Sequence, residues 1–266
     1  MEANKFYSSG NMGNMKTNSS VILMLLALAA LNSSCIHYYY APSSNNVPLF
    51  KEKKEVRIQA QYSTVGIRAD GSKDIGGFEM QSAYAITNHA AVQLNFLHVA
   101  DAEQDYGSGH GSYVEAAGGY FKPLHNKNWI FETYGGFGIG TVNSIYGTSS
   151  ESAKTSITKF FAQPSFGYSR NHFAFAVSSK FSLVDFGVRS STISKDNNPT
   201  DYDYVESFKK GKSYFWWEPG FMIRGGFKHV QVFLQATYTV MNDNNLPFFN
   251  SNSSIGIVVP FKIKSK

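Results

Sequence analysis

The stretch HFAFAVSSKFSL, residues 172–183, alternates between bulky apolar side chains and small or polar ones. Its odd positions carry mostly Phe, Val and Leu, and its even positions carry mostly Ala, Ser and Lys. Successive side chains of a β-strand point to opposite faces, so a period of two predicts a strand with one apolar face. The stretch is about as long as the roughly 9 to 11 residues that cross a bilayer at a tilt.

The same alternation recurs along most of the chain and predicts an all-β fold of about ten antiparallel strands. The links between them alternate in length: residues 87–89 and 169–171 are short, whereas 100–111 and 185–212 are long and polar. Short turns at one end and long loops at the other are typical of outer-membrane barrels. An even strand number also places both ends of the barrel on the short-turn side. The predicted strands are 56–64, 78–86, 92–96, 114–120, 131–140, 160–168, 172–183, 217–224, 230–238 and 255–261.

The composition excludes several classes of protein. Only 16% of the 266 residues are charged, against roughly 25% in an ordinary soluble domain, and 15% are aromatic. A disordered tail would have few aromatic residues, and a helical membrane bundle would show several apolar runs of about 20 residues. The net charge of +5 arises from 24 Lys and Arg against 19 Asp and Glu, with no dense basic cluster. We therefore expect no nucleic-acid partner.

Side-chain size indicates which face of the predicted sheet meets lipid. The polar faces carry mainly Gly, Ala and Ser with few charges, as in a narrow lumen, whereas a face exposed to water would carry many Lys and Glu. The apolar faces carry Phe, Tyr and Trp, which suit the interfaces of a membrane. We therefore predict an antiparallel up-and-down transmembrane β-barrel. The alternative is a soluble periplasmic barrel, similar to a lipocalin, that binds a hydrophobic ligand.

Several charged and amide side chains fall on the face predicted to line the lumen. A buried carboxylate is costly unless it is paired or protonated, so we predict a network of salt bridges and hydrogen bonds, with Arg224 and Gln235 as further partners. The alternative is a gated polar path or a site for a small solute. The predicted network comprises Arg57, Glu79, Glu115, Glu132, Gln163, Lys180 and Glu218.

The amino-terminal region has one apolar run, residues 21–31, which follows Lys16. Eleven helical residues rise only about 16 Å, less than a hydrocarbon core of roughly 30 Å. A basic start, a short apolar core and small residues before a cut site are typical of a secretory signal peptide. We expect residues 1–34 to be that peptide, and a start at Met15 would leave residues 1–14 untranslated.

The only cysteine, Cys35, follows this segment directly. The stretch resembles the lipobox of bacterial lipoproteins, in which a small residue precedes a cysteine that is lipidated and becomes the mature amino terminus. Ser33 and Ser34 fit that pattern, whereas Asn32 stands where Leu is usual. The resemblance implies a lipid such as palmitate on Cys35. Ile36 follows the cysteine, so the aspartate that marks retention in the inner membrane is absent.

Residues 35–54 have the composition of a linker. They contain two prolines, several Ser and Asn residues, and no regular period. We expect them to form an extended, lipidated tether that enters from the short-turn, periplasmic side. Residues 55–263 then form the β-barrel domain.

Residues for enzyme chemistry gather only in the predicted loop near residue 100. A rim protease would need acidic residues beside a histidine, and a lipid deacylase would need a serine beside a histidine on the wall. Acidic residues and glycine are also ordinary in a solvated loop, so we expect no enzyme; the alternative is an outer-membrane hydrolase using the long loops. No metal-ligand spacing occurs, and no cofactor is expected. The residues weighed for catalysis are His98, Asp101, Glu103, Asp105 and His110.

The run YAPSSNNVPLFKEKKEVRIQAQY, residues 40–62, resembles the start of uncharacterised outer-membrane lipoproteins of Gram-negative bacteria. In these, a short linker with an Asn-x-Pro-Leu-like motif precedes the first strand. The resemblance implies a lipid-anchored outer-membrane barrel with a structural, surface or narrow-pore role. Its partners would be outer-membrane lipid and the machineries that process lipoproteins and insert barrels. The residues that carry the resemblance are Asn46, Val47, Pro48, Leu49 and Glu55.

Overall fold

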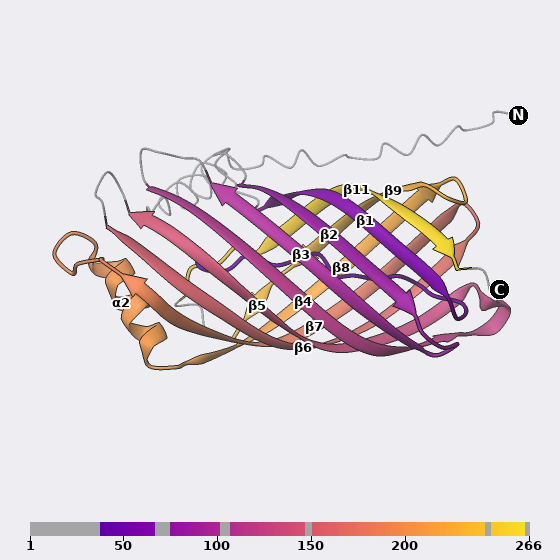
Figure 1. Ribbon diagram of the computed structural model, residues 1–266, viewed down its shortest axis with the longest axis horizontal. Helices are drawn as coiled ribbons and strands as arrows, with labels where there is room; N and C mark the ends of the chain where they lie inside the picture. The colour runs from indigo at the N-terminus through magenta and orange to yellow at the C-terminus, as the bar shows by residue number, and fades with distance from the viewer. Residues whose placement is uncertain (1–37, 67–74, 102–106, 147–150, 243–245, 264–266) are drawn as a thin grey trace, which may run out of the picture. The chain divides into compact units, whose positions relative to one another are not determined.

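The computed structural model describes residues 38–66, 75–101, 107–146, 151–242 and 246–263. Within these residues, ten strands form a tilted antiparallel ring (Figure 1). The strands of the ring are β1 (Glu55–Val65), β2 (Ile75–Ala85), β3 (Ala90–Asp101), β4 (Gly107–Pro123), β5 (Trp129–Tyr146), β6 (Ser152–Arg170), β7 (Phe173–Ser191), β8 (Ser213–Gly226), β9 (Gln231–Tyr238) and β11 (Ser251–Lys262). Three short elements accompany them: η1 (His125–Lys127), α2 (Pro199–Lys209) and β10 (Val240–Met241).

The ring is closed, so the barrel has no free edge. From β1 to β8 each strand pairs with its neighbours in sequence, and β9 pairs with both β8 and β11. The first and last strands meet along their whole length, from Glu55 opposite Lys262 to Val65 opposite Asn252. This arrangement confirms the predicted all-β, up-and-down barrel of about ten strands. None of the helices among the described residues has the length and apolar character to span a membrane.

The outward face of the barrel is a belt of large apolar side chains. Leu94 is 54% exposed, Phe160 58% and Leu183 52%, while their neighbours in sequence point into the lumen. A soluble barrel would place such side chains inside and polar ones outside. The exposed belt therefore has the parity predicted for a membrane barrel and contradicts the lipocalin-like alternative.

The wall is taller than predicted at the long-loop end. β6 and β7 each have 19 residues, so the expected length of 9 to 11 is wrong for these strands. Beyond Leu183 the apolar residues change from the outer to the inner face of the strand. Val184 and Phe186 point inward and are buried, and Asp185 and Arg189 take outward positions. Outside the lipid a barrel is organised like a soluble one, so the apolar residues move to the inner face.

The helix α2 caps this taller end. Residues 185–212 were expected to be loop, yet they contain the end of β7 and all of α2. Pro199 begins the helix and Lys209 lies in its last turn, both favourable positions. Phe208 stacks on Phe186 of β7 with ring centroids 4.8 Å apart. The helix is thus held by an apolar cluster inside the mouth of the barrel.

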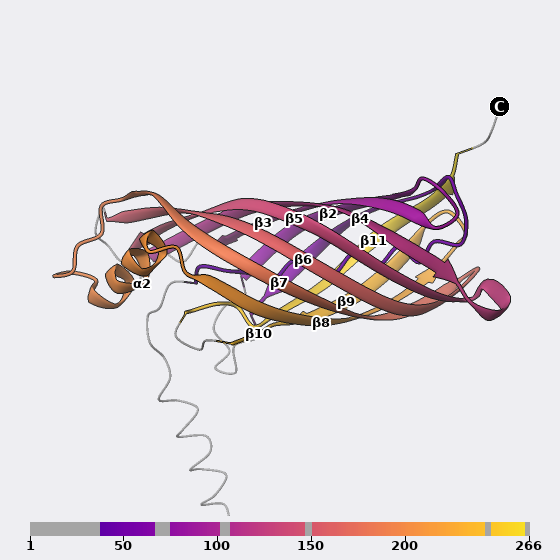
Figure 2. The same ribbon diagram turned by 90° about the horizontal axis from the view of Figure 1, so that it is seen from below.

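The segment before β1 runs through the lumen. At the long-loop end, the Tyr39 hydroxyl donates to Asp201 of α2 (2.9 Å); at the short-turn end, the Lys54 amide donates to the Ala85 carbonyl (2.8 Å). Between them, every residue from Pro42 to Phe50 is buried. Figures 1 and 2 show this thin trace between the strands, starting near α2. The expectation of an external tether entering from the short-turn side is wrong for these residues: the segment has no regular secondary structure, but it fills the barrel.

Candidate functional site: the occupied lumen

The segment of residues 42–50, called here the luminal segment, is held by side chains of the wall. An extended chain without a neighbouring strand leaves its amide and carbonyl groups without partners, and buried groups of this kind need hydrogen bonds. Seven wall side chains donate to its carbonyls. They are Asn252 to Pro42 (2.8 Å), Gln81 to Ser44 (2.7 Å), Gln235 to Asn45, Gln93 and Gln163 to Asn46 (3.2 and 2.8 Å), Arg224 to Pro48 (3.0 Å), and Arg57 to Leu49 (3.5 Å).

Two wall carboxylates accept hydrogen bonds from amides of the luminal segment. Glu79 accepts from the Ser44 amide (3.1 Å) and also from Ser63 and Asn252. Glu132 accepts from the Phe50 amide (2.9 Å). Glu79 is therefore satisfied by neutral donors and takes part in the predicted network through hydrogen bonds.

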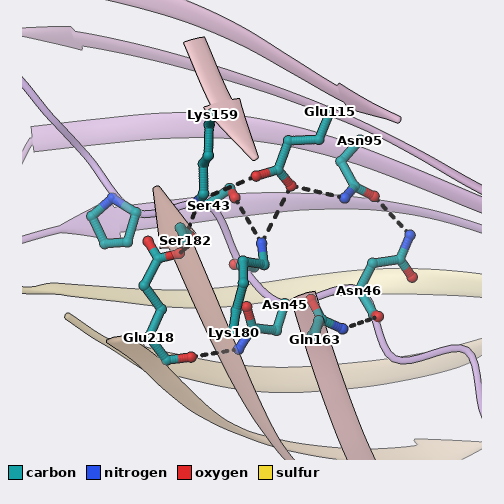
Figure 3. Close-up of polar contacts among 12 residues, drawn as sticks. Ser43, Asn45, Asn46, Asn95, Glu115, Lys159, Gln163, Lys180, Ser182 and Glu218 are labelled. Carbon is teal, nitrogen blue, oxygen red and sulfur yellow. Dashed lines mark hydrogen bonds and ion pairs between the residues drawn. The ribbon is translucent and has the colours of Figure 1, made fainter. Parts of the chain in front are cut away.

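Four charged side chains form a cluster near the start of the luminal segment (Figure 3). Lys159 Nζ lies 2.8 Å from Glu218 Oε2 and 3.3 Å from Glu115 Oε1, and Lys180 Nζ lies 3.3 Å from Glu115 Oε2. All four side chains are at most 1% exposed. Two positive and two negative charges balance, which is what makes their burial tolerable.

The chain inside the barrel also contributes to this charged cluster. The Tyr40 hydroxyl donates to Glu218 Oε1 (2.6 Å) and accepts from Lys159 Nζ (2.8 Å). Lys180 Nζ donates to the Ser43 hydroxyl (3.3 Å). The threaded chain and the cluster are therefore one hydrogen-bonded unit.

Apolar side chains close the lumen above and below these polar groups. At the long-loop end Tyr40 stacks on Trp216 with centroids 4.5 Å apart. At the short-turn end Phe50 packs against Phe121 with centroids 5.7 Å apart. Leu49, between them, is fully buried in a further apolar cluster. The lumen is thus filled along its length.

The residues predicted to line the lumen do point into it, and they divide between two tasks. Glu115, Lys180 and Glu218 belong to the charged cluster, whereas the others contact the luminal segment. Lys159 was missed because the predicted strand began at Phe160. Its odd position, shared with Phe161 and Gln163, places it on the inward face. The predicted residues that contact the segment without belonging to the charged cluster are Arg57, Glu79, Glu132 and Gln163.

Of the residues weighed for catalysis, His98 has a serine beside it. His98 Nδ1 lies 2.9 Å from Ser112 Oγ on the adjacent strand. The pair sits just beyond exposed Phe96 and Val114, at the upper edge of the apolar belt. His110 pairs instead with Asn143 (3.0 Å). The contact between Ser112 and His98 could not be predicted from sequence spacing alone, because it depends on the register of β3 and β4.

Other predicted residues lie outside what the structure describes. Cys35, Glu103 and Asp105 are outside the described residues, as is the predicted signal peptide, and the Asp101 side chain is not described. Within the described residues, no group of three or more His, Cys, Asp or Glu side chains is arranged to hold a metal ion.

The sequence matches no known protein family and no curated protein. Three solved structures share the barrel architecture at low sequence identity. The attachment invasion locus protein Ail of Yersinia pestis has a TM-score of 0.36 and 13% identity, covering 79% of this chain and 99% of its own. An outer membrane channel of Pseudomonas putida F1 has a TM-score of 0.39 and 11% identity, and the match covers 82% of this chain and 100% of the channel. A loop-deletion mutant of OmpT, an outer membrane protein of Vibrio cholerae, has a TM-score of 0.29 and 7% identity, and the match covers 78% of this chain and 98% of the mutant. These likenesses concern the barrel architecture alone.

Proposed function

We propose that this protein is a non-enzymatic outer-membrane β-barrel, anchored by lipid on Cys35, with a structural or surface role rather than that of a pore. The observation that carries the proposal is the luminal segment. Each of its residues is buried, and wall side chains bind it along its length. A conducting barrel needs a continuous aqueous path, and here protein occupies that space. The taller end with α2 is then the part presented at the cell surface.

Conductance in planar lipid bilayers tests the closed lumen. The full-length protein is expected to show no single-channel steps. A variant that lacks residues 38–50 loses the luminal segment and is expected to conduct ions, because the remaining lumen is lined by polar and charged groups. Stable open channels in the full-length protein would overturn the proposal.

Location and lipid anchoring need a separate test. The protein is expected in the outer-membrane fraction, with an unboiled form of anomalous mobility on a detergent gel, because closed barrels resist unfolding by detergent. Metabolic labelling with palmitate is expected to label the chain, and Cys35→Ala is expected to remove the label. If that substitution alone released the protein into the soluble fraction, the membrane-barrel proposal would fail.

The contact between His98 and Ser112 favours one second candidate, hydrolysis of lipid esters. A serine hydroxyl becomes a nucleophile when an adjacent base accepts its proton. His98 is within hydrogen-bond reach of Ser112, and the pair faces outward where the apolar belt ends. The carbonyls of lipid esters lie at that boundary between headgroup and hydrocarbon.

Release of fatty acid from phospholipid micelles tests this candidate. The purified protein would release fatty acid, and Ser112→Ala and His98→Ala would each lower the rate at least about 100-fold. Thr141→Ala is the matched control, since Thr141 lies opposite Ser112 on β5. A rate equal to that of protein-free micelles would eliminate the candidate and leave the non-enzymatic proposal.

A further inference from the structure

The threaded chain leaves the barrel beside the start of β11. Tyr38, the first described residue, stacks on Phe249 with ring centroids 4.1 Å apart. The Tyr39 amide donates to the Pro247 carbonyl (3.2 Å), and the Phe249 amide donates to the Tyr40 carbonyl (2.9 Å). These contacts place the exit at the long-loop end, above the side of the barrel formed by β9, β11 and β1.

A groove of about 500 Å³ lies on the outer wall of this same side, across β8, β9, β11 and β1. Sites for small ligands commonly have volumes of roughly 300–1,000 Å³. Small side chains lie among larger ones there, and the large ones are exposed on the apolar belt. Hydrocarbon is therefore the medium from which the groove is reached. Its lining residues include Tyr62, Thr64, Leu234, Ala236, Ser253 and Ile255.

The groove and the chain exit are linked by close contacts. The Phe249 ring covers Gly66, where an added Cβ would lie 2.5 Å from Phe249 Cδ1. The Gly66 amide donates to the Ser251 carbonyl (2.9 Å). Two residues along the strands from these positions, roughly 7 Å away, Thr64 and Ser253 line the groove. Its upper end is thus next to the place where the chain emerges.

We propose that this groove seats an acyl chain carried by Cys35, so that the lipid anchor lies in the membrane leaflet at the long-loop end. The proposal rests on the lipidation included in the proposed function. Cys35 precedes Tyr38 by three residues, which span at most about 11 Å. The groove faces hydrocarbon, so its occupant is an acyl chain, and the anchor on Cys35 is the one covalently held near it.

The opposite leaflet is too far for this anchor. β1 has 11 residues, roughly 36 Å of strand, and a tilt of about 45° still leaves roughly 25 Å of height between its two ends. Three residues from Tyr38 do not cover that height. An anchor at the short-turn end would require the luminal segment to leave the barrel.

Photo-crosslinking through the anchor itself tests the proposal. Cells are fed a fatty acid with a diazirine group, irradiated, and the purified protein is digested for mass spectrometry. The acylated peptide that begins at Cys35 is expected to be joined to peptides containing residues 62–64, 234–236 or 253–255. Joining mainly to peptides at the short-turn end, around Val56, Val230 or Phe261, would overturn the proposal, as would an even distribution around the barrel.

The same experiment separates failure of this proposal from failure of the proposed function. A chain without acyl label on Cys35 would reject the lipid anchor altogether, whereas a labelled chain joined elsewhere would reject only the groove. The double substitution Ala236→Leu and Ser253→Leu fills the groove and is expected to lower the specific crosslink at least about fivefold. Val177→Leu, at an exposed position on β7 outside the groove, is the control and is expected to leave the crosslink unchanged.

Discussion

At the scale of single residues, the charged cluster has the least tolerance for change. Lys159 contacts both Glu218 and Glu115, so Lys159→Met leaves two carboxylates with only Lys180. Removing one partner of a buried ion pair typically costs about 3–5 kcal/mol, and we expect a loss of that size in the free energy of unfolding, measured by urea titration in detergent.

Lys154→Met is the control for this substitution. Lys154 lies on the same strand but points outward and is exposed, so its loss is expected to change stability by less than about 0.5 kcal/mol. Equal effects of the two substitutions would show that Lys159 does not serve as the counter-ion of the buried glutamates.

Glu151, at the rim before β6, joins two loops of the long-loop end. Hydrogen bonds from Ser194, Asn197 and Asn198, each 2.7 Å long, lower the pKa of this carboxyl from 4.5 to about 2. A carboxyl with a lowered pKa in the folded state stabilises that state above its ordinary pKa, and the contribution disappears as the pH falls toward 2.

Carboxyl ¹³C NMR of the protein in detergent is the measurement for Glu151. We expect a titration midpoint near 2 in the wild type and a midpoint closer to 4.5 in Asn198→Ala, which removes one donor. A wild-type midpoint at the ordinary value would contradict the hydrogen bonds by which Glu151 joins the two loops.

At the scale of elements, the strands of the lipid belt were predictable and their upper ends were not. Within the belt, apolar residues keep one parity, as from Phe173 to Leu183. Above it the medium outside changes from lipid to water, and Val184 and Phe186 reverse the parity. An uninterrupted pattern therefore predicts a strand that ends at Leu183 and a loop after it, whereas β7 continues to Ser191.

The luminal segment could not be predicted as such because its composition is that of an exposed linker. What buries it is the set of amide and guanidinium donors on seven strand positions, which only the closed barrel brings together. The Asn-x-Pro-Leu motif does have a physical role here. The Asn46 side chain donates to Asn95 Oδ1 (2.7 Å), and Leu49 enters an apolar cluster.

The helix α2 depends on one aromatic side chain. Phe208 is 2% exposed and packs against Phe186 and Tyr39. Truncation of a buried Phe commonly costs about 3–5 kcal/mol, so Phe208→Ala is expected to release α2 from the barrel mouth. Limited proteolysis would then cut within residues 192–212 at least about tenfold faster.

Lys209→Ala provides the comparison for Phe208→Ala, because Lys209 lies in the same helix with an exposed side chain. It is expected to leave the cutting rate within about twofold of the wild type. Unchanged resistance in Phe208→Ala would show that contacts other than the aromatic cluster hold the helix.

At the scale of the whole molecule, the threaded chain places the amino-terminal and carboxyl-terminal ends of the barrel domain on opposite sides of the membrane. The chain enters at the long-loop end beside Tyr38, and β11 ends at the short-turn end. Among the described residues, the chain therefore crosses the barrel an odd number of times, once as the luminal segment and ten times as a strand. An even-stranded barrel with an external tether would instead have both ends on the same side of the membrane.

Epitope tags on intact cells distinguish these two topologies. A tag inserted between residues 37 and 38 is expected to bind antibody without permeabilisation, as is a tag after Asn197 in the long link before α2. A tag after Thr87, in the short turn between β2 and β3, is expected to bind only after the outer membrane is opened. If the first tag behaved like the third while the second remained accessible, the chain would not be threaded in the cell. If the second tag were also protected, the orientation of the barrel itself would be reversed.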